Sequence, residues 1–95
     1  MSVTFHIETN SFEEMQALGT EGAPEVNVSN TNGGVIHVAL GMPDPSLSGG
    51  WDVWGEMDAD EFLDRLVAGS PVHRMFELAE VARAAKCLGR RVVWS

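Results

Sequence analysis

The chain is poor in cysteine and in long apolar runs, and both absences limit what it can be. It holds one cysteine, Cys87, which excludes an internal disulfide and fits a reducing compartment. No run approaches the roughly 20 apolar residues of a membrane-spanning helix, and the first residues form no basic, apolar leader. We therefore expect neither membrane association nor a signal peptide. The 95 residues show no internal repeat and suffice for one domain.

Positive charge is absent from the first two thirds of the chain. Residues 1–64 contain 12 of the 14 acidic residues and no lysine or arginine, whereas residues 65–95 contain 2 acidic and all 6 basic residues, for a net charge of −8. Direct nucleic-acid binding is not expected, because it needs basic side chains on phosphates. Two interpretations stay open: the C-terminal basic residues neutralise the chain's own acids, or an acidic face docks on a basic partner.

Apolar periodicity predicts an α+β fold with one domain over residues 1–95. Strict alternation predicts strands at residues 3–8 and 25–28, and "RRVVWS" predicts a terminal strand. Capping signals predict four helices, beginning near residues 11, 29, 58 and 70, and residues 42–57 are predicted to be irregular. We therefore expect a small three-stranded sheet packed on one face by three to four helices.

Each of the last three predicted helices has an apolar stripe that we expect to face the core. In the first of them the stripe is Val35, Ile36, Ala39 and Leu40, and in the next it is Phe62, Leu63, Leu66 and Val67. In the last it comprises Val72, Met75, Phe76, Leu78, Ala79, Val81, Ala82, Ala85 and Leu88.

Three segments resemble a group of small proteins encoded by actinobacterial phages. They are "EVNVSNTN" with the following "LG", "DADEFLDRL", and an alanine-rich helix ending in "GRRVVWS", within Glu25–Gly41, Asp58–Val67 and Ala79–Trp94. Similar proteins tend to carry alanines where this chain has Gly33 and Gly34, and often a longer insertion before the last helix. The resemblance implies a phage accessory protein that acts in the host cytoplasm. It implies no reaction and no catalytic residue.

The segment "SGGWDVWGEM" is the better candidate for a partner-binding site. Trp51 and Trp54 stand three residues apart among glycines, and tryptophan is enriched at interface hot spots. The neighbouring acids Asp52 and Glu56 suit a basic partner. The alternative is that both indole rings fold back as a lid on the core.

The segment "EVNVSNTNGG" is the candidate for a ligand site. A strand that runs into a helix start can present backbone N–H groups to an anion, here with Asn27, Asn30, Asn32, Gly33 and Gly34. Neither a G-x-G-x-x-G pattern nor a Walker lysine is present. Helix capping with turn hydrogen bonds is the preferred interpretation, and the glycine pair indicates close approach of another backbone.

We expect no metal, no cofactor and no catalytic residue. His6, His37, His73 and Cys87 are scattered, without an i, i+4 pair or a C-x-x-C motif. His37 is expected as a core or boundary histidine. The acids between residues 58 and 64 are explained by capping and a solvated helix face, and no G-x-S-x-G motif is present.

The sequence therefore favours a non-enzymatic protein that binds a host or phage protein without covalent chemistry, for example as an inhibitor of a host or defence protein. Self-association is another form of this function, through edge strands expected at either terminus. Two alternatives remain. One is a small-ligand or nucleotide-binding protein that uses the Asn27–Gly34 turn, and the other is a minor structural component of the virion.

Overall fold

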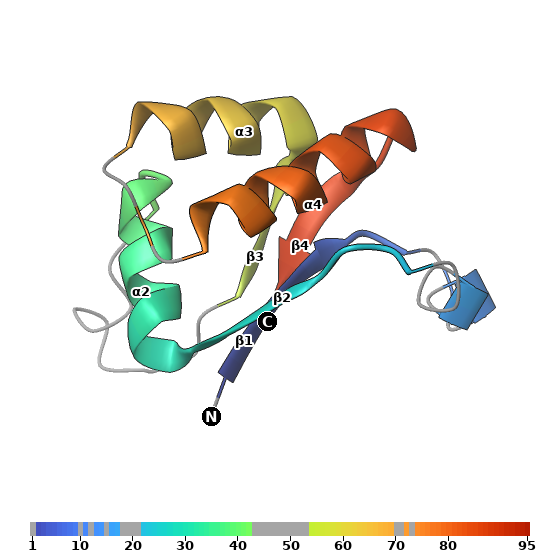
Figure 1. Ribbon diagram of the computed structural model, residues 1–95, viewed down its shortest axis with the longest axis horizontal. Coiled ribbons are helices and arrows are strands. Elements are labelled where there is room, and N and C mark those ends of the chain that lie inside the picture. The colour runs from blue at the N-terminus through green and yellow to red at the C-terminus, as the bar shows by residue number, and fades with distance from the viewer. Residues whose placement is uncertain are drawn as a thin grey trace.

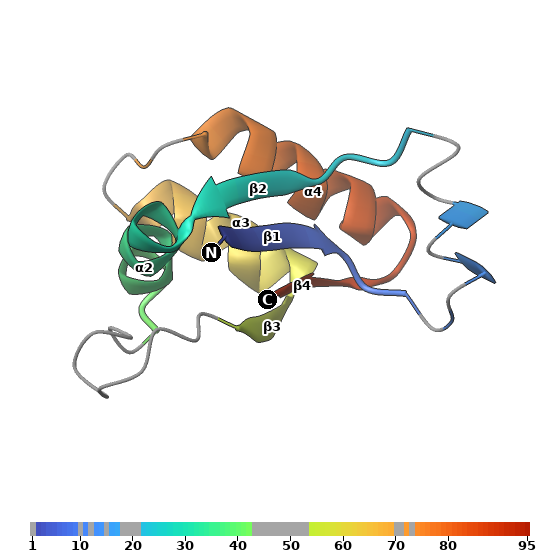
Figure 2. The ribbon, with the colours of Figure 1, turned by 90° about the horizontal axis from the view of Figure 1, so that it is seen from below.

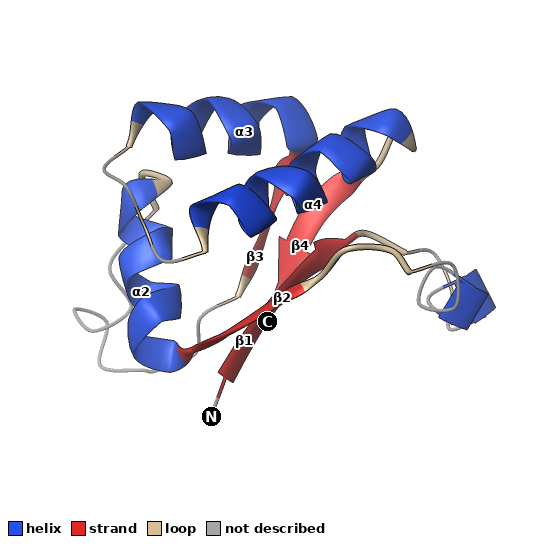
Figure 3. Ribbon diagram, in the orientation of Figure 1, coloured by secondary structure: helices blue, strands red, loops and turns tan. Residues whose placement is uncertain are grey.

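The structure is a computed structural model that describes residues 2–9, 11, 13–14, 16–17, 22–42, 54–69, 72 and 74–95. The elements within these residues are shown in Figures 1 and 3. In chain order they are β1 (Ser2–Ile7), β2 (Val26–Ser29), α2 (Asn30–Ala39), β3 (Gly55–Asp58), α3 (Ala59–Ala68), α4 (Met75–Cys87) and β4 (Arg91–Trp94). The α+β class is as predicted, in one antiparallel sheet with three described helices.

The sheet has the strand order β2-β1-β4-β3, and every neighbouring pair is antiparallel. It has one strand more than predicted, because β3 lies in the segment expected to be irregular. The sequence "GEMD" has low strand propensity, and its pairing with β4 from Gly55↔Trp94 to Asp58↔Arg91 makes it a strand. The terminal strands β1 and β4 are the two inner strands, so the expectation of edge strands at the termini is wrong.

The described helices leave one face of the sheet open. Helices α3 and α4 lie together on one face, and α2 stands at one end of the sheet (Figure 2). Alternation along the strands turns Val3, Phe5 and Ile7 toward the helices and Thr4 and His6 to the other side. The core is centred on three rings: Trp94 lies 5.4 Å from Phe5 and 5.9 Å from Phe62, centroid to centroid.

The helix ends follow local chemistry. Ser29 caps α2, because its hydroxyl accepts a hydrogen bond from Asn32 N at 3.2 Å, and Gly41 beyond the helix has a left-handed φ of 77°. Asp58 occupies the corresponding position of α3, so the predicted start near residue 58 is confirmed, but its side chain makes no cap hydrogen bond. The N–H of Glu14 donates to Ser11 Oγ at 3.1 Å, as predicted for the first helix, which otherwise lies largely outside the described residues.

Helix α4 starts later than predicted. Arg74 adopts a left-handed conformation with φ 59°, and the helix begins at Met75 instead of Pro71, which like Ser70 and His73 lies outside the described residues. The buried arc of α4 includes Leu78. Phe76, two positions before it, points about 200° away around the helix at roughly 100° per residue.

Four residues predicted to face the core are exposed instead: Val35, Val67, Phe76 and Leu88. Phe76 is 88% exposed. The predicted stripes were wider than the arcs that the sheet and neighbouring helices cover. No helix in the described ranges is long and apolar enough to cross a bilayer.

Candidate functional site

The tryptophan segment meets the sheet at β3. Trp54 directly precedes this strand and is 70% exposed, while Trp51 and Asp52 lie outside the described residues. For Trp54, the alternative that the indole ring folds back as a lid is therefore wrong. Side-chain alternation places residues 54, 56 and 58 on one side of β3, opposite the buried Met57. Trp54, Glu56 and Asp58 thus share the side that faces away from the helices.

The open face of the sheet continues from these residues across all four strands. The strand register places Val93 of β4 between Glu56 of β3 and His6 of β1. Asn27 of β2 lies opposite Thr4, and its amide Nδ2 donates to Thr4 Oγ1 at 2.8 Å and to Ser2 Oγ at 3.1 Å. A mostly polar, solvent-facing surface with an exposed indole at one corner results. We call these residues the open face: Thr4, His6, Asn27, Trp54, Glu56, Asp58, Arg91 and Val93.

Charge on the open face is partly neutralised from within the chain. Arg91 Nη1 lies 2.8 Å from Glu56 Oε1. Asp58, by contrast, makes no ion pair with any described residue. Among the described residues, the open face therefore keeps one carboxylate without an ion pair, two residues from a paired one.

Ion pairs link the two unequal halves of the chain. Among the described residues, five of the six basic side chains pair with acids: Arg65 with Glu61, Arg74 with Glu77, Lys86 with Asp60, Arg90 with Glu14, and Arg91 with Glu56. Four of these acids belong to the acidic first 64 residues. This pattern supports the interpretation that the C-terminal basic residues neutralise the chain's own acids. It leaves the remaining acids to set the surface potential.

The asparagine segment is built mainly as a strand-to-helix junction. Ser29 caps the helix, and Gly33 is buried on the inner side of α2. The Asn27 amide is bound to β1, while Asn30 and Asn32 lie half-buried in the first turn of α2. The structure thus gives a local role to Asn27 and to the cap. Asn30, Asn32, Gly33 and Gly34 remain candidates for an anion site without any basic side chain of their own.

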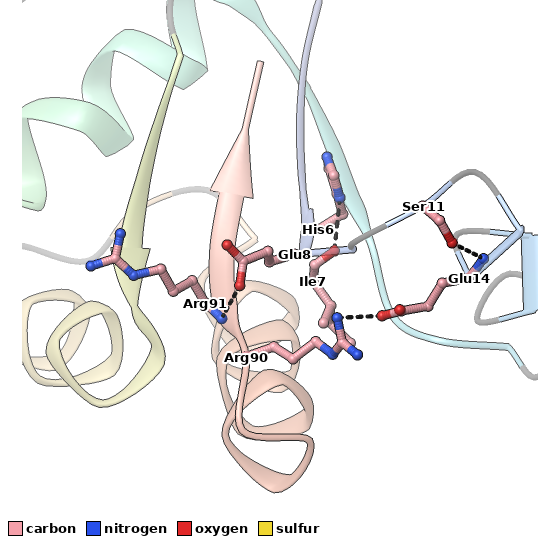
Figure 4. Close-up of polar contacts among 7 residues, drawn as sticks. All are labelled: His6, Ile7, Glu8, Ser11, Glu14, Arg90 and Arg91. Atoms are coloured by element: carbon pink, nitrogen blue, oxygen red, sulfur yellow. Dashed lines mark hydrogen bonds and ion pairs between the residues drawn. The ribbon is translucent and has the colours of Figure 1, made fainter.

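A charged cleft of about 440 Å³ lies where β1 ends and β4 begins. Its lining residues are Glu8, Asp58, Ala59, Asp60, Lys86, Gly89, Arg90 and Arg91. Figure 4 shows Arg90 paired with Glu14, and Glu8 Oε1 accepting a hydrogen bond from Arg91 N at 3.5 Å. Three acids face three bases, so the cleft has no excess charge with which to select an ion.

Lys86 and Asp60 close one side of this cleft and tie α4 to α3. Their charged atoms lie 2.7 Å apart, and the hydrogen bond and charge of Asp60 raise the pKa of Lys86 above its usual value. A raised lysine pKa contributes stability below the unfolded pKa of about 10.4 and loses it as pH rises through the higher folded value. Both groups are exposed, so the contribution is small.

The histidine placed on α2 is part of the core. His37 is buried, and its ring meets the Trp94 indole edge-on at a centroid distance of 5.9 Å. On β1, His6 Nδ1 lies 3.0 Å from the Ile7 carbonyl oxygen. Within the described ranges, no three His, Cys, Asp or Glu side chains are grouped so as to hold a metal ion.

Two features of the site could not be found from the sequence. Arg74 reaches from the start of α4 to Asn27 O of β2, and Val93 becomes the centre of the open face only because β4 is an inner strand. The segment "RRVVWS" predicted a terminal strand, but its three consecutive apolar residues gave neither the side of Val93 nor its neighbours. Comparison of the chain with protein-family models, with curated proteins and with solved structures finds no match in any of the three.

Proposed function

We propose that this chain is a non-enzymatic accessory protein that binds a partner protein through Trp54 and the acidic residues beside it on β3. The observation that carries this proposal is the exposed indole of Trp54 next to Glu56 and Asp58 on the open face. An exposed tryptophan supplies large contact area at low entropic cost, so it serves well as an interface anchor. Trp51 and Asp52, next to Trp54 in the sequence, belong to the same proposed surface.

The charge distribution supports a partner with a basic surface. In the described part of the chain, Asp58 has no ion-pair partner, and Glu56 pairs only with Arg91. A basic partner gains attraction from these carboxylates, whereas nucleic acid is repelled. In keeping with the resemblance to small actinobacterial phage proteins, we propose that the interaction takes place in the host cytoplasm. The proposed partner is a host, defence or phage protein, and inhibition is one form of action.

Affinity capture with matched variants tests this proposal. Wild-type protein, Trp54→Ala and Phe76→Ala are immobilised and exposed to extract from infected actinobacterial cells, and captured proteins are quantified by mass spectrometry. Phe76 is the control because its ring is exposed on α4, on the helical side of the molecule. We expect Trp54→Ala to lose a defined protein at least tenfold and Phe76→Ala to retain it. Loss with Phe76→Ala and retention with Trp54→Ala would place the interface on the helices instead.

The ligand-binding alternative uses the N-terminus of α2. One site at 100 times its dissociation constant adds roughly 2.7 kcal/mol to stability, which a thermal shift with nucleotides detects. If the affinity capture enriches no protein and nucleotides produce such a thermal shift, the ligand-binding alternative is favoured. Presence of the chain in purified particles at stoichiometric amounts would favour a virion component.

A further inference from the structure

At each edge of the sheet, alternate residues turn their backbone N–H and C=O groups outward. Thr4 exchanges both backbone hydrogen bonds with Ser95, at 3.0 and 3.3 Å, and the Glu8 amide donates to Arg91 O at 2.9 Å. Because backbone groups alternate between the two sides of a strand, Phe5 then bonds toward β2 and Trp94 toward β3. The backbone groups that face away from the sheet are therefore those of Asn27 and Ser29 on β2 and of Glu56 and Asp58 on β3. Ser29 and Asp58 lead directly into α2 and α3, so Asn27 and Glu56 are the outward residues within each edge.

The β2 edge is closed by the chain itself. Arg74 Nη1 donates to Asn27 O at 2.8 Å, which also verifies the outward direction of that carbonyl group. Glu77 holds the guanidinium in place, because it accepts from Arg74 Nε at 2.7 Å. A charged side chain on an edge strand prevents pairing with another chain.

Among the described residues, none covers the β3 edge in this way. In the described ranges no side chain or backbone group is bonded to the outward N–H or C=O of Glu56. The exposed Trp54 directly precedes this strand, which carries the Glu56 and Asp58 carboxylates. Asp58 makes no side-chain cap hydrogen bond and no ion pair with a described residue. An unpaired edge with side chains of this kind offers main-chain hydrogen bonds for affinity and alternate side chains for specificity.

We infer that the β3 edge accepts an extended basic segment of the partner protein as a fifth, antiparallel strand. This inference rests on the proposed function and names the chemistry of its partner. Residues directly opposite each other share a face, so every second residue of the segment meets Trp54, Glu56 or Asp58. Arginine at those positions pairs with the two carboxylates and lies against the indole. The guanidinium opposite Asp58 meets a carboxylate that no described residue occupies.

A second copy of this chain does not suit the same edge. Antiparallel pairing about a twofold axis at Glu56 sets one Glu56 opposite the other. Like charges directly opposite in a sheet are destabilising, and each protomer carries a net charge of −8. Charge therefore selects a basic segment over self-association.

A peptide of alternating arginine and valine, acetyl-(Arg-Val)₃-amide, is the probe. In antiparallel register the arginine N–H groups face β3 and the valine N–H groups face solvent. We expect binding at low salt, slowing of amide hydrogen exchange at Glu56 by at least tenfold, and no change at Asn27. N-methylation of the arginine amides should abolish binding, and N-methylation of the valine amides should leave it. Equal loss from both, exchange unchanged at Glu56, or dimerisation of the free chain through β3 would each overturn the inference.

Two substitutions at one residue supply the matched control on the protein. Glu56→Pro removes the outward N–H without touching a ladder hydrogen bond to β4, a place where edge strands tolerate proline. Glu56→Gln removes the charge and keeps the N–H. We expect at least tenfold weaker peptide binding for Glu56→Pro than for Glu56→Gln, with both folds checked by circular dichroism. If Glu56→Pro does not fold, the two N-methylated peptides test the inference with wild-type protein.

The outcomes separate the inference from the proposed function. If Trp54→Ala abolishes capture of the partner but Glu56→Pro and Glu56→Gln capture it equally, the proposed function holds and strand addition is ruled out. If the peptide binds at Glu56 but Trp54→Ala captures the partner as well as wild type does, the proposed partner surface is ruled out and the open β3 edge is retained.

Discussion

Gly55 is the residue at which β3 passes over the largest ring of the core. A Cβ atom there would lie 2.6 Å from Cζ2 of Trp94, closer than real contacts allow, and the indole is fixed by Phe5 and Phe62. We therefore predict that Gly55→Ala destabilises the fold by about 1–3 kcal/mol, as overpacking does. Urea unfolding followed by circular dichroism measures the loss. Glu56→Ala, on the open face of the same strand, is the control and should stay within about 0.5 kcal/mol.

Two phenylalanines in the helical layer have opposite surroundings. Phe62 of α3 is fully buried against Phe5, with ring centroids 6.2 Å apart, and Phe76 of α4 is 88% exposed. We predict that Phe62→Ala costs about 3–5 kcal/mol of unfolding free energy. Phe76→Ala should change it by less than about 0.5 kcal/mol. Equal losses in chemical denaturation would mean that Phe76 is covered in solution.

At the scale of elements, α2 and α3 each follow an edge strand without a loop, yet their first turns are held differently. The Ser29 hydroxyl binds Asn32 N, whereas Asp58 acts on α3 only through its charge. We predict a loss of about 1 kcal/mol for Ser29→Ala that persists in 0.5 M sodium chloride. The loss for Asp58→Ala, about 0.3–1 kcal/mol at low salt, should disappear at that concentration, because salt screens the helix dipole. Thermal denaturation at two salt concentrations compares the variants; a salt-sensitive Ser29→Ala effect would argue against the cap.

Elements also explain which predictions succeeded. Helix α2 begins at Asn30, within one residue of the predicted start, because the Ser29 hydroxyl binds its own helix and needs no distant partner. The start of α4 was predicted too early, and β3 was not predicted at all. Both depend on neighbours far along the chain: Arg74 reaches Asn27, and Gly55 pairs with Trp94. Local patterns carry no information about such partners.

At the scale of the whole molecule, the sheet is centred on the pairing of the first strand with the last. His6 of β1 lies opposite Val93 of β4, and β4 in turn holds β3. We predict that truncation after Arg90 abolishes folding, because it removes an inner strand and the Trp94 ring with it. Circular dichroism and one-dimensional NMR should show an unfolded chain. Deletion of Ser95 alone should leave the fold intact, and a folded truncation product would contradict the central position of β4.

The same long-range pairing affects the candidate site. The sequence indicated Trp54 and Glu56 from composition alone, since tryptophan and acid among glycines suit an interface. It could not indicate that Asn27 and Glu56 occupy equivalent outward positions on opposite edges, because strand order decides which strands are edges. Nor could it show that Arg74 closes one of these edges and leaves the other open.

The amino-acid sequence by itself determined the α+β class, the inward sides of β1 and β2, the start of α2 and the uneven charge of the two halves. These properties depend on alternation, helical spacing and residues within one turn of each other. The tertiary structure alone decided the strand order, the exposure of Phe76 and the open edge at β3. These depend on which distant segments lie side by side, and that arrangement is stabilised by packing contacts throughout the core.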